Sequence, residues 1–553
     1  MTSFLLMTIW IMPLIIALFA FWRRVRWIAP LAVIPAISCS ILLTGEHLIE
    51  IDWLLLGTHL GLDETGRWFL VSSALVWAAS AIYAFKWPQN SAHAAIFYLF
   101  FLLAMSGNFL LILAMDMVTF YLGFALMGLS AFGLIVANSN VQTLKTAYFY
   151  LGWTIVGEVI LFSAIILLAG QSDSIQFSQL KTVSLDEFAL ILVVIGFGIK
   201  IALPGLHMWL PLTYSVLPSA AAAVFSGPMI SAGLLGLIRF LANPNYGYDS
   251  VGQLLLVAGF IGALSAAVVG LLQSCPKVAL GYSSMAKMGL LAATLGLSLV
   301  HPSDSSVLVL AITVYAVHHL LVKSALFLGI ELLEQNVARA IIISATLILC
   351  LTLASLPLTT GSLAKAELIN AIPVEASWFK VWLSVVSITS MLLIGRILYL
   401  LLSIPPKAGS ANISGLIVWL GICLLVIVFP LVSGYQHEEF SNIIPVIVTI
   451  AVILFVWQQK PKTLKRWVGL VPPGDILHPL VFSLNRIKQF MLLPAASILK
   501  QTEEVMLRKW QTLVQWSGKI SFQTFTQPRI DSVWIIITSL LFVLVMTGNY
   551  LNI

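Results

Sequence analysis

Lysines within apolar stretches are the first residues of this chain that suggest chemistry. Lys200 closes an apolar run that begins near Phe188, and Pro204 and Gly205 follow it in the stretch GFGIKIALPGLHMWLP (196–211). Proline removes a backbone donor and glycine loosens the chain, so the sequence predicts a helix break just after the lysine. A cation beside a helix broken at membrane depth indicates a functional site. The alternative is a lysine that extends from a helix end to the lipid headgroups.

A second stretch has the same residue types in a different order. In residues 356–368, Pro357 and Gly361 precede Lys365, whereas in the first stretch the lysine precedes the helix breakers. Paired interrupted spans are typical of transporters that are built from internal repeats, with the transport path near the membrane midplane. The sequence therefore predicts two repeats, and the reversed order favours an inverted relation between them.

Further ionisable side chains fall within apolar runs, where each is expected to find a partner or a wet cavity. His319 and Lys323 are four residues apart and therefore share one helix face. Lysine removed from water and histidine can both exchange protons near neutral pH, so a water-joined series of them could pass protons. The histidines could instead make polar contacts between helices, and Lys287 and Arg396 could pair with neighbouring carbonyls or carboxylates. The set is Glu158, His207, Lys277, Lys287, His318, His319, Lys323, Glu331, Glu367 and Arg396.

The elements that hold these residues are expected to be helices that cross a membrane. Of the 553 residues, 60% are hydrophobic and 9% are charged, a balance that soluble globular domains do not reach. We predict an all-α polytopic membrane protein with about 14–16 transmembrane helices. The seventh and twelfth helices are expected to be broken, and the eighth could be broken as well. The apolar runs lie near 4–22, 27–44, 68–86, 94–115, 117–137, 146–169, 187–204, 218–241, 251–272, 279–299, 305–329, 340–372, 380–403, 413–433, 441–457 and 532–549.

Loops of two kinds alternate along the chain. Basic loops, such as the one with Arg23 and Arg24, alternate with acidic loops, such as the one with Asp63 and Glu64. The positive-inside rule makes the basic loops cytoplasmic. An even number of spans then places both termini on the outer face of the cell inner (plasma) membrane. The net charge of +6 is concentrated in the basic loops on one side and in the C-terminal tail. We therefore expect the lipid bilayer, and no nucleic acid, as a partner.

No cofactor site is expected in this chain. The cysteines at positions 39, 275, 350 and 423 are scattered, without metal-ligand spacing, and no glycine-rich dinucleotide loop follows a strand. By itself the chain is therefore not expected to be a redox enzyme.

Four motifs between about Gly61 and Tyr399 resemble those of a known family. That family comprises the antiporter-like membrane subunits shared by respiratory complex I, membrane-bound hydrogenases and Mrp-type cation/proton antiporters. Its K-x-x-x-P-x-x-x-W-L-P motif is matched with one extra residue, and its K-x-x-L-A-Y-S, H-x-x-x-K-x-x-L-F and P-x-x-x-G-x-x-x-K motifs are also present. The matching residues are Lys200, Pro204, Trp209–Pro211; Lys277, Tyr282, Ser283; His319, Lys323, Leu326, Phe327; and Pro357, Gly361, Lys365.

The resemblance implies a proton path and a division of the chain. Lys200 would exchange protons in the first half-channel, Lys277, His319 and Lys323 would form a central hydrophilic axis, and Lys365 would stand near the outer exit. The amphipathic stretch 476–525 is expected to lie along the membrane surface, either as a linker or as a clamp on partner subunits. The expected segments are N-terminal transmembrane helices (1–90), two antiporter-like repeats (91–245 and 246–405), additional helices (406–457), an amphipathic lateral segment (458–531) and a final span (532–553).

Two positions depart from the family pattern. The fifth span of the family carries a glutamate where this chain has Ala125, and the eighth often has a His-Gly pair where this chain has Ser226 and Gly227. Spans five and six are consecutive and antiparallel, and Glu158 of span six is expected at about the depth of Ala125. We therefore expect Glu158 to replace the family glutamate as the electrostatic partner of Lys200. The alternative is a neutral glutamate bound to a backbone or hydroxyl group.

The sequence supports three functional hypotheses. The leading one is a subunit that moves protons, or sodium, within a multisubunit membrane complex of the Mrp or complex I kind. The second places the same chain in a redox complex, such as an NADH-quinone oxidoreductase or membrane hydrogenase, whose other subunits carry the cofactors. The third is a scaffold or coupling subunit that does not pump, for example in inorganic-carbon uptake.

Overall fold

A computed structural model describes residues 2–43, 45, 47–54, 56–86, 92–137, 141–243, 245–335, 337–407, 412–432, 445–451 and 471–474. They belong, except for Gly474, to a compact unit that ends at Pro473. The expected final span (532–553), and the lateral segment (458–531) apart from residues 471–474, lie outside the described residues.

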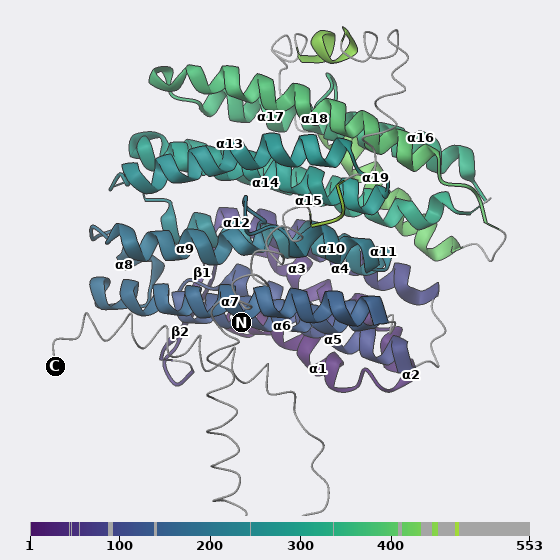
Figure 1. Ribbon diagram of the computed structural model, residues 1–553. Helices are drawn as coiled ribbons and strands as arrows, with labels where there is room; N and C mark the ends of the chain where they lie inside the picture. The colour runs from purple at the N-terminus through teal and green to yellow at the C-terminus, as the bar shows by residue number, and fades with distance from the viewer. Residues whose placement is uncertain are drawn as a thin grey trace, which may run out of the picture. The chain divides into compact units, whose positions relative to one another are not determined.

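The described residues are almost entirely helical, as the sequence predicted, and the helices lie side by side in layers (Figure 1). One two-stranded antiparallel hairpin was not predicted, in which Leu48 pairs with Gly61. The helices are α1 (Thr2–Leu18), α2 (Arg23–Arg26), α3 (Ile34–Leu42), α4 (Glu64–Tyr83), α5 (Ala92–Leu113), α6 (Met117–Val136), α7 (Val141–Ser172), α8 (Phe177–Leu180), α9 (Glu187–Lys200), α10 (Trp209–Val216), α11 (Ser219–Val224), α12 (Ile230–Leu241), α13 (Asp249–Leu271), α14 (Pro276–Val300), α15 (Ser305–Leu333), α16 (Arg339–Leu353), α17 (Thr360–Ala371), α18 (Trp378–Leu402) and α19 (Ile413–Val432), with strands β1 (His47–Ile51) and β2 (Thr58–Leu62) and short helical turns at 29–33, 84–86, 225–229, 302–304 and 374–376.

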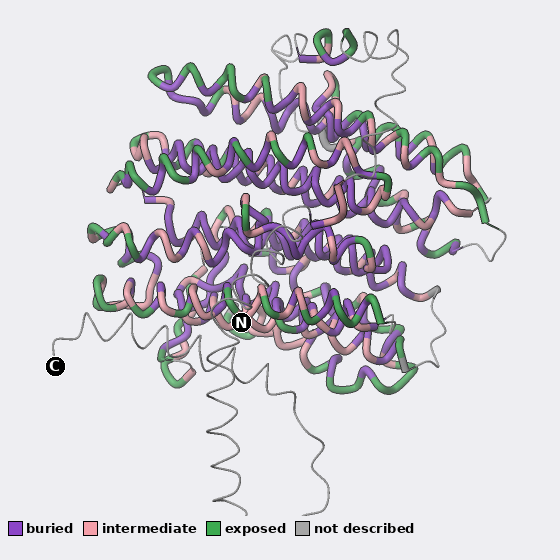
Figure 2. The backbone as a smooth tube through the Cα atoms, viewed as in Figure 1, coloured by how far each residue is buried: buried purple, intermediate pink, exposed green. Residues whose placement is uncertain are grey.

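Eight helical segments of the described part are long and apolar enough to cross a membrane, and four shorter apolar helices accompany them. The most enclosed are 219–241 and α14, whose apolar windows are 100% and 94% buried. By contrast, the window of α7 is only 33% buried, so most of its residues there are half-buried or exposed (Figure 2). The core that holds the polar residues therefore lies around 219–241 and α14.

The helix break predicted after Lys200 is confirmed. α9 ends at Lys200 and α10 begins only at Trp209. Between them, Ala202 and Gly205 have φ values of 60° and 81°, in the left-handed region that stops a helix. The 32-residue helix α7 packs against both α9 and α10, so one long helix spans the break.

The second predicted break is also present, between α16 and α17. Ser355 and Leu358 have φ values of 57° and 64° there. The Thr359 side chain then accepts a hydrogen bond from the Ser362 amide and starts α17. The long helix α15 packs against both α16 and α17, as α7 does at the first break.

The eighth predicted span, residues 219–241, is continuous and contains a π-helical turn in place of a break. Residues Phe225–Met229 form a π-helical turn between α11 and α12, and this turn contains Pro228. Because proline lacks an amide hydrogen, the turn leaves backbone carbonyls outside the regular α-helical ladder.

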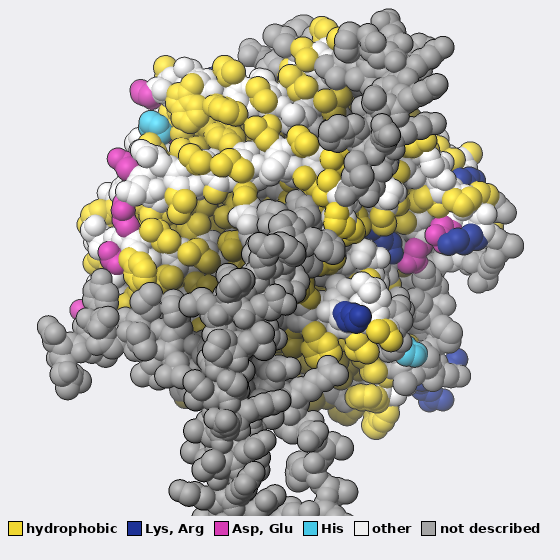
Figure 3. All heavy atoms as spheres, in the orientation of Figure 1, with side chains coloured by type: hydrophobic (Ala, Val, Ile, Leu, Met, Phe, Trp, Pro, Cys, Tyr) yellow, Lys and Arg dark blue, Asp and Glu magenta, His cyan; other side chains and the backbone are white. Residues whose placement is uncertain are grey.

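Charge is divided between the two ends of the helices. Aspartate and glutamate side chains gather along the left edge in Figure 3, and most lysine and arginine side chains lie toward the right. Helices α4 and α13 begin with acidic residues at one end, whereas α16 begins with Arg339 at the other. This separation agrees with the alternation of loops in the sequence.

Candidate functional site

Lys200 lies inside the protein at the broken end of α9. Its side chain is buried, and its Nζ donates a hydrogen bond to the hydroxyl of Tyr150 on α7, at 3.4 Å. That hydroxyl in turn donates to the carbonyl of Gly128 on α6, at 2.9 Å. The lysine stem packs against Gly233 of α12, where a Cβ would meet the Lys200 Cβ at 3.0 Å. Lys200 therefore faces the interior, in contact with α6, α7 and α12.

Glu158 lies next to this site without making an ion pair. Its buried Oε1 has no hydrogen-bond partner among the described residues, and no contact within 4.0 Å joins it to Lys200. The two groups are still close enough to influence each other electrostatically. The carboxylate lies against α6, since a Cβ on Gly128 would come within 2.9 Å of Oε1. Gly128 is three residues beyond Ala125, so Glu158 faces the part of α6 where the sequence lacks a carboxylate.

A second group of basic side chains lies around Lys287 of α14. This lysine is buried and donates a hydrogen bond to the Tyr315 hydroxyl on α15, at 2.8 Å. Its charge acts on four basic side chains from α15 and α17, namely His318, His319, Lys323 and Lys365. Lys287 of α14 therefore lies near basic side chains of both α15 and α17.

The members of the second group differ in how they are held. Lys323 donates to the carbonyl of Leu280 at 2.8 Å, and His318 shares a 3.2 Å hydrogen bond with the Thr360 hydroxyl at the start of α17. His319 and the Lys365 Nζ are buried without a hydrogen-bond partner among the described residues. Buried polar groups in this state are suited to exchange hydrogen bonds with water.

The segment 219–241 lies between the two groups. Gly233 contacts Lys200 at one side, and the π-helical turn faces α15 at the other, where the Ser324 hydroxyl donates to the Ala223 carbonyl at 2.9 Å. Ser226 also donates to Ala223 and stands where the family often has a histidine. Two hydroxyls, from Ser226 and Ser324, and the Ala223 carbonyl of α11 therefore lie on this side of the segment.

Three further predicted path residues lie outside the two groups. Lys277 is only half-buried, at the basic end of α14, and donates to the Leu217 carbonyl at 2.7 Å. Glu367 is half-buried in α17 and lines a cavity that also reaches His318. His207 is buried in the connection between α9 and α10. Lys277 lies in the first turn of α14 and is half-buried there.

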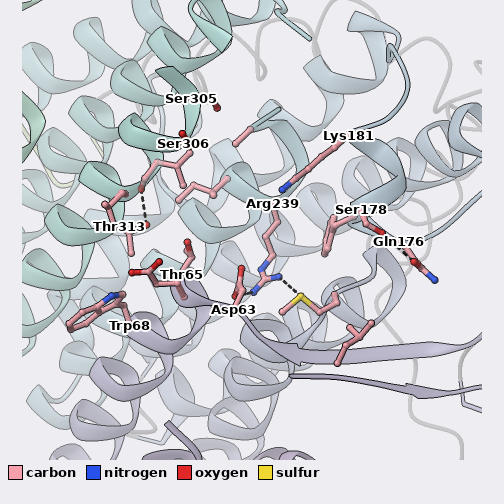
Figure 4. Close-up of a pocket in the computed structure, with 18 of the residues that line it drawn as sticks. Asp63, Thr65, Trp68, Gln176, Ser178, Lys181, Arg239, Ser305, Ser306 and Thr313 are labelled. Atoms are coloured by element: carbon pink, nitrogen blue, oxygen red, sulfur yellow. Dashed lines mark hydrogen bonds and ion pairs between the residues drawn. The ribbon is translucent and has the colours of Figure 1, made fainter. Parts of the chain in front are cut away.

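Two cavities lie beside α4. The first, of about 580 Å³, is lined by Asp63 and Arg239, which form an ion pair at 3.0 Å and face each other in Figure 4. The second, of about 490 Å³, is mainly apolar and is bordered by His318 and Glu367. Trp68 of α4 lies in the wall of both cavities.

Sequence reasoning missed several residues of these sites. Tyr150, Tyr315 and Thr360 have side chains that contact predicted site residues, but tyrosine and threonine are common in apolar helices and carry no signal alone. Lys287 belongs to the set predicted from the sequence, with pairing to a neighbouring carbonyl or carboxylate as the alternative. Within the described residues, no group of three or more His, Cys, Asp or Glu side chains could hold a metal ion.

Both groups of site residues lie within one region of the chain that matches a known family. A family profile described as NADH:quinone oxidoreductase/Mrp antiporter, transmembrane, matches residues 114–393. This region includes both broken helices and every charged residue of the two groups.

Curated relatives come from several kinds of complex. Hydrogenase-4 component B of Escherichia coli is 28% identical over 244 residues, which cover 42% of this chain and 36% of the relative. F(420)H(2) dehydrogenase subunit N of Methanosarcina mazei is 24% identical over 465 residues, covering 75% of this chain and 90% of that relative. A putative antiporter subunit mnhD2 of Staphylococcus haemolyticus is 33% identical over 159 residues, 27% of this chain and 31% of the relative. The chain thus spans little more than a third of the first relative's length.

Solved structures share the fold at lower identity. A chain of the Mrp complex from Dietzia sp. DQ12-45-1b matches with a TM-score of 0.76 at 17% identity, covering 97% of this chain and 65% of the other. A chain of an archaeal membrane-bound sulfane sulfur reductase matches with a TM-score of 0.67 at 19% identity, covering 77% of this chain and 94% of the other.

Proposed function

Because the chain belongs to the NADH:quinone oxidoreductase/Mrp antiporter transmembrane family, we propose that it is a proton- or cation-translocating subunit of a multisubunit membrane complex. Its buried lysines and histidines would pass protons between the two broken helices. We place it in the cell inner membrane, with the basic loops cytoplasmic and both termini outside.

The buried row of basic side chains supports this proposal most strongly. Lys200, Lys323 and Lys365 are all less than 10% exposed, and each lies on or packs against a broken helix or its long neighbouring helix. Charges at membrane depth are costly and are typical of ion pathways. A purely structural role would favour paired charges, yet no ion pair joins these lysines to carboxylates within the part that the structure describes.

Substitution of Lys200 tests the proposal. We expect Lys200→Ala to reduce proton translocation, measured as quenching of a pH-sensitive dye in inside-out vesicles, to the level of vesicles without the protein. Assembly should persist, because removing a buried unpaired charge leaves the apolar packing in place. Lys380→Ala is the matched control, since Lys380 is exposed on α18. Full activity of the assembled Lys200→Ala complex would refute the proposal.

The kind of complex is a separate question. Two of the curated relatives carry the names of a hydrogenase component and a dehydrogenase subunit, and another that of an antiporter subunit, so a redox complex is a second candidate. Mass spectrometry of the purified complex distinguishes them. Subunits that carry iron–sulfur clusters or flavin would support the redox candidate, whereas small membrane subunits alone would support an antiporter.

A further inference from the structure

The ammonium group of Lys200 lies among three aromatic rings. Its Nζ is 5.9 Å from the ring centroid of Phe124, 5.7 Å from that of Tyr150 and 5.9 Å from that of Trp209. A cation within about 6 Å of a ring centroid is attracted by the negative face of the ring, and more strongly when water is excluded. The rings come from α6, α7 and α10, so three helices contribute to one aromatic cage, which consists of Phe124, Tyr150 and Trp209.

Neighbouring contacts fix the rings of the cage. The Trp209 indole donates a 2.8 Å hydrogen bond to the Ile199 carbonyl, directly before Lys200. Tyr150 packs edge-on against Trp209, with centroids 5.3 Å apart, and its hydroxyl is held by the Gly128 carbonyl. Phe124 packs edge-on against Phe197 at 5.2 Å. The cage is therefore preorganised around the place of the cation.

The cage surrounds the lysine where a direct carboxylate partner is absent. Glu158 makes no contact with Lys200 within 4.0 Å, and the contacts that lead from one to the other pass through the Tyr150 hydroxyl and Gly128. Glu158 is also the acidic side chain whose charge acts on Lys200. The hydroxyl of Tyr150 therefore lies along the line of contacts between the cation and the acid.

We propose that Phe124, Tyr150 and Trp209 hold the charged form of Lys200 in place of a directly paired carboxylate, and that the Tyr150 hydroxyl orients its ammonium toward Glu158. The inference rests on the proposed translocation function. Phe124, Tyr150 and Trp209 are positioning residues that act on the proton-exchanging lysine.

Paired substitutions separate the cage from ordinary packing. Trp209→Leu removes a ring, whereas Trp209→Phe keeps a ring without the indole N–H. We expect Trp209→Leu to slow translocation per assembled complex by roughly 2- to 30-fold, the effect of losing one cation–ring attraction, and Trp209→Phe to retain most of the rate. Tyr150→Phe keeps the ring and removes the hydroxyl, so it should also slow translocation if the hydroxyl orients Lys200.

Two controls match these variants closely. Trp419 is equally buried and donates its indole N–H to the Ala325 carbonyl at 2.7 Å, on α19 and away from Lys200. Tyr98 is buried and donates to the Ala81 carbonyl at 3.0 Å. Trp419→Leu and Tyr98→Phe should leave the rate per assembled complex unchanged.

Adding a carboxylate near Lys200 tests the cage, because restored translocation would not be explained by packing alone. If the cage takes the place of a carboxylate, Ala125→Glu should restore translocation in the Trp209→Leu background. The cage would be overturned, with Lys200→Ala still abolishing transport, by either of two results. One is an equal rate of translocation in Trp209→Leu, Trp209→Phe and wild type. The other is a loss in Trp209→Leu that Ala125→Glu leaves unchanged. Retained transport in Lys200→Ala would instead overturn the underlying function.

Discussion

At the scale of single residues, the position of a carboxylate distinguishes this chain. The motif resemblance places Ala125 where the family has a glutamate, and Glu158 on the neighbouring helix lies against the same part of α6. The space for it comes from Gly128, whose missing side chain leaves room for Oε1. Gly128 is thus the residue that admits a carboxylate from another helix.

Gly128→Ala tests this arrangement. The new methyl group would lie 2.9 Å from the Glu158 Oε1, so the flexible end of the glutamate must move away. We expect nearly unchanged thermal stability and a clear fall in translocation in the vesicle assay. Gly152→Ala on α7 is the control, because nothing lies within 4 Å of its added Cβ. Equal rates in the two variants would show that the position of Glu158 does not matter.

At the scale of elements, each broken helix is accompanied by one long continuous helix. α7 packs along α9 and α10, and α15 packs along α16 and α17. Both breaks use residues other than glycine in left-handed conformations, Ala202 in the first and Ser355 and Leu358 in the second. Such conformations cost about 1–3 kcal/mol each, persist only where the surrounding packing imposes them, and cluster at functional sites.

Gly361→Ala tests the packing at the second break. A Cβ at this position would overlap the carbonyl of Thr352 at the end of α16, which is backbone and cannot rotate away. We expect a loss of about 1–3 kcal/mol in stability, as for other overpacked sites, seen as a lower midpoint of thermal unfolding in detergent. Gly395→Ala on α18 has open space for its methyl group and should keep the midpoint. An unchanged midpoint in Gly361→Ala would contradict the close approach.

At the scale of the whole molecule, we propose that the enclosed polar residues form one route with two ends. Segment 219–241 contacts Lys200 on one side and α15 on the other, and one cavity is bordered by His318 while another is lined by Asp63 and Glu64. Because carboxylates and lysines gather at opposite ends of the helices, the route has a direction relative to the membrane.

The C-terminal part of the chain gives a prediction at this scale. The amphipathic stretch 476–525 is proposed to lie along the membrane and hold partner subunits. A chain ended after Trp457 should insert into the membrane yet lose its partners, seen as a smaller complex on native gels. An unchanged complex size would favour a simple linker.

The sequence alone determined the helical class, the two breaks and the lysines beside them. These features are local: proline and glycine act on their own turn of helix, and an apolar run commits a segment to a membrane span. Motif spacing also identified Lys200, His319, Lys323 and Lys365, all of which the structure buries.

Only the tertiary structure decided which side chains meet. Tyr150 is fifty residues from Lys200 in the chain, and its contact depends on how α7 packs against α9. Lys287 lies near His319 and Lys365 because α14, α15 and α17 pack together. Lys277 lies in the first turn of α14, where it is half-buried. Helix rotation and depth set these contacts. An apolar sequence specifies them weakly, because nearly every face of such a helix is apolar and hydrophobicity alone does not select the face that turns inward.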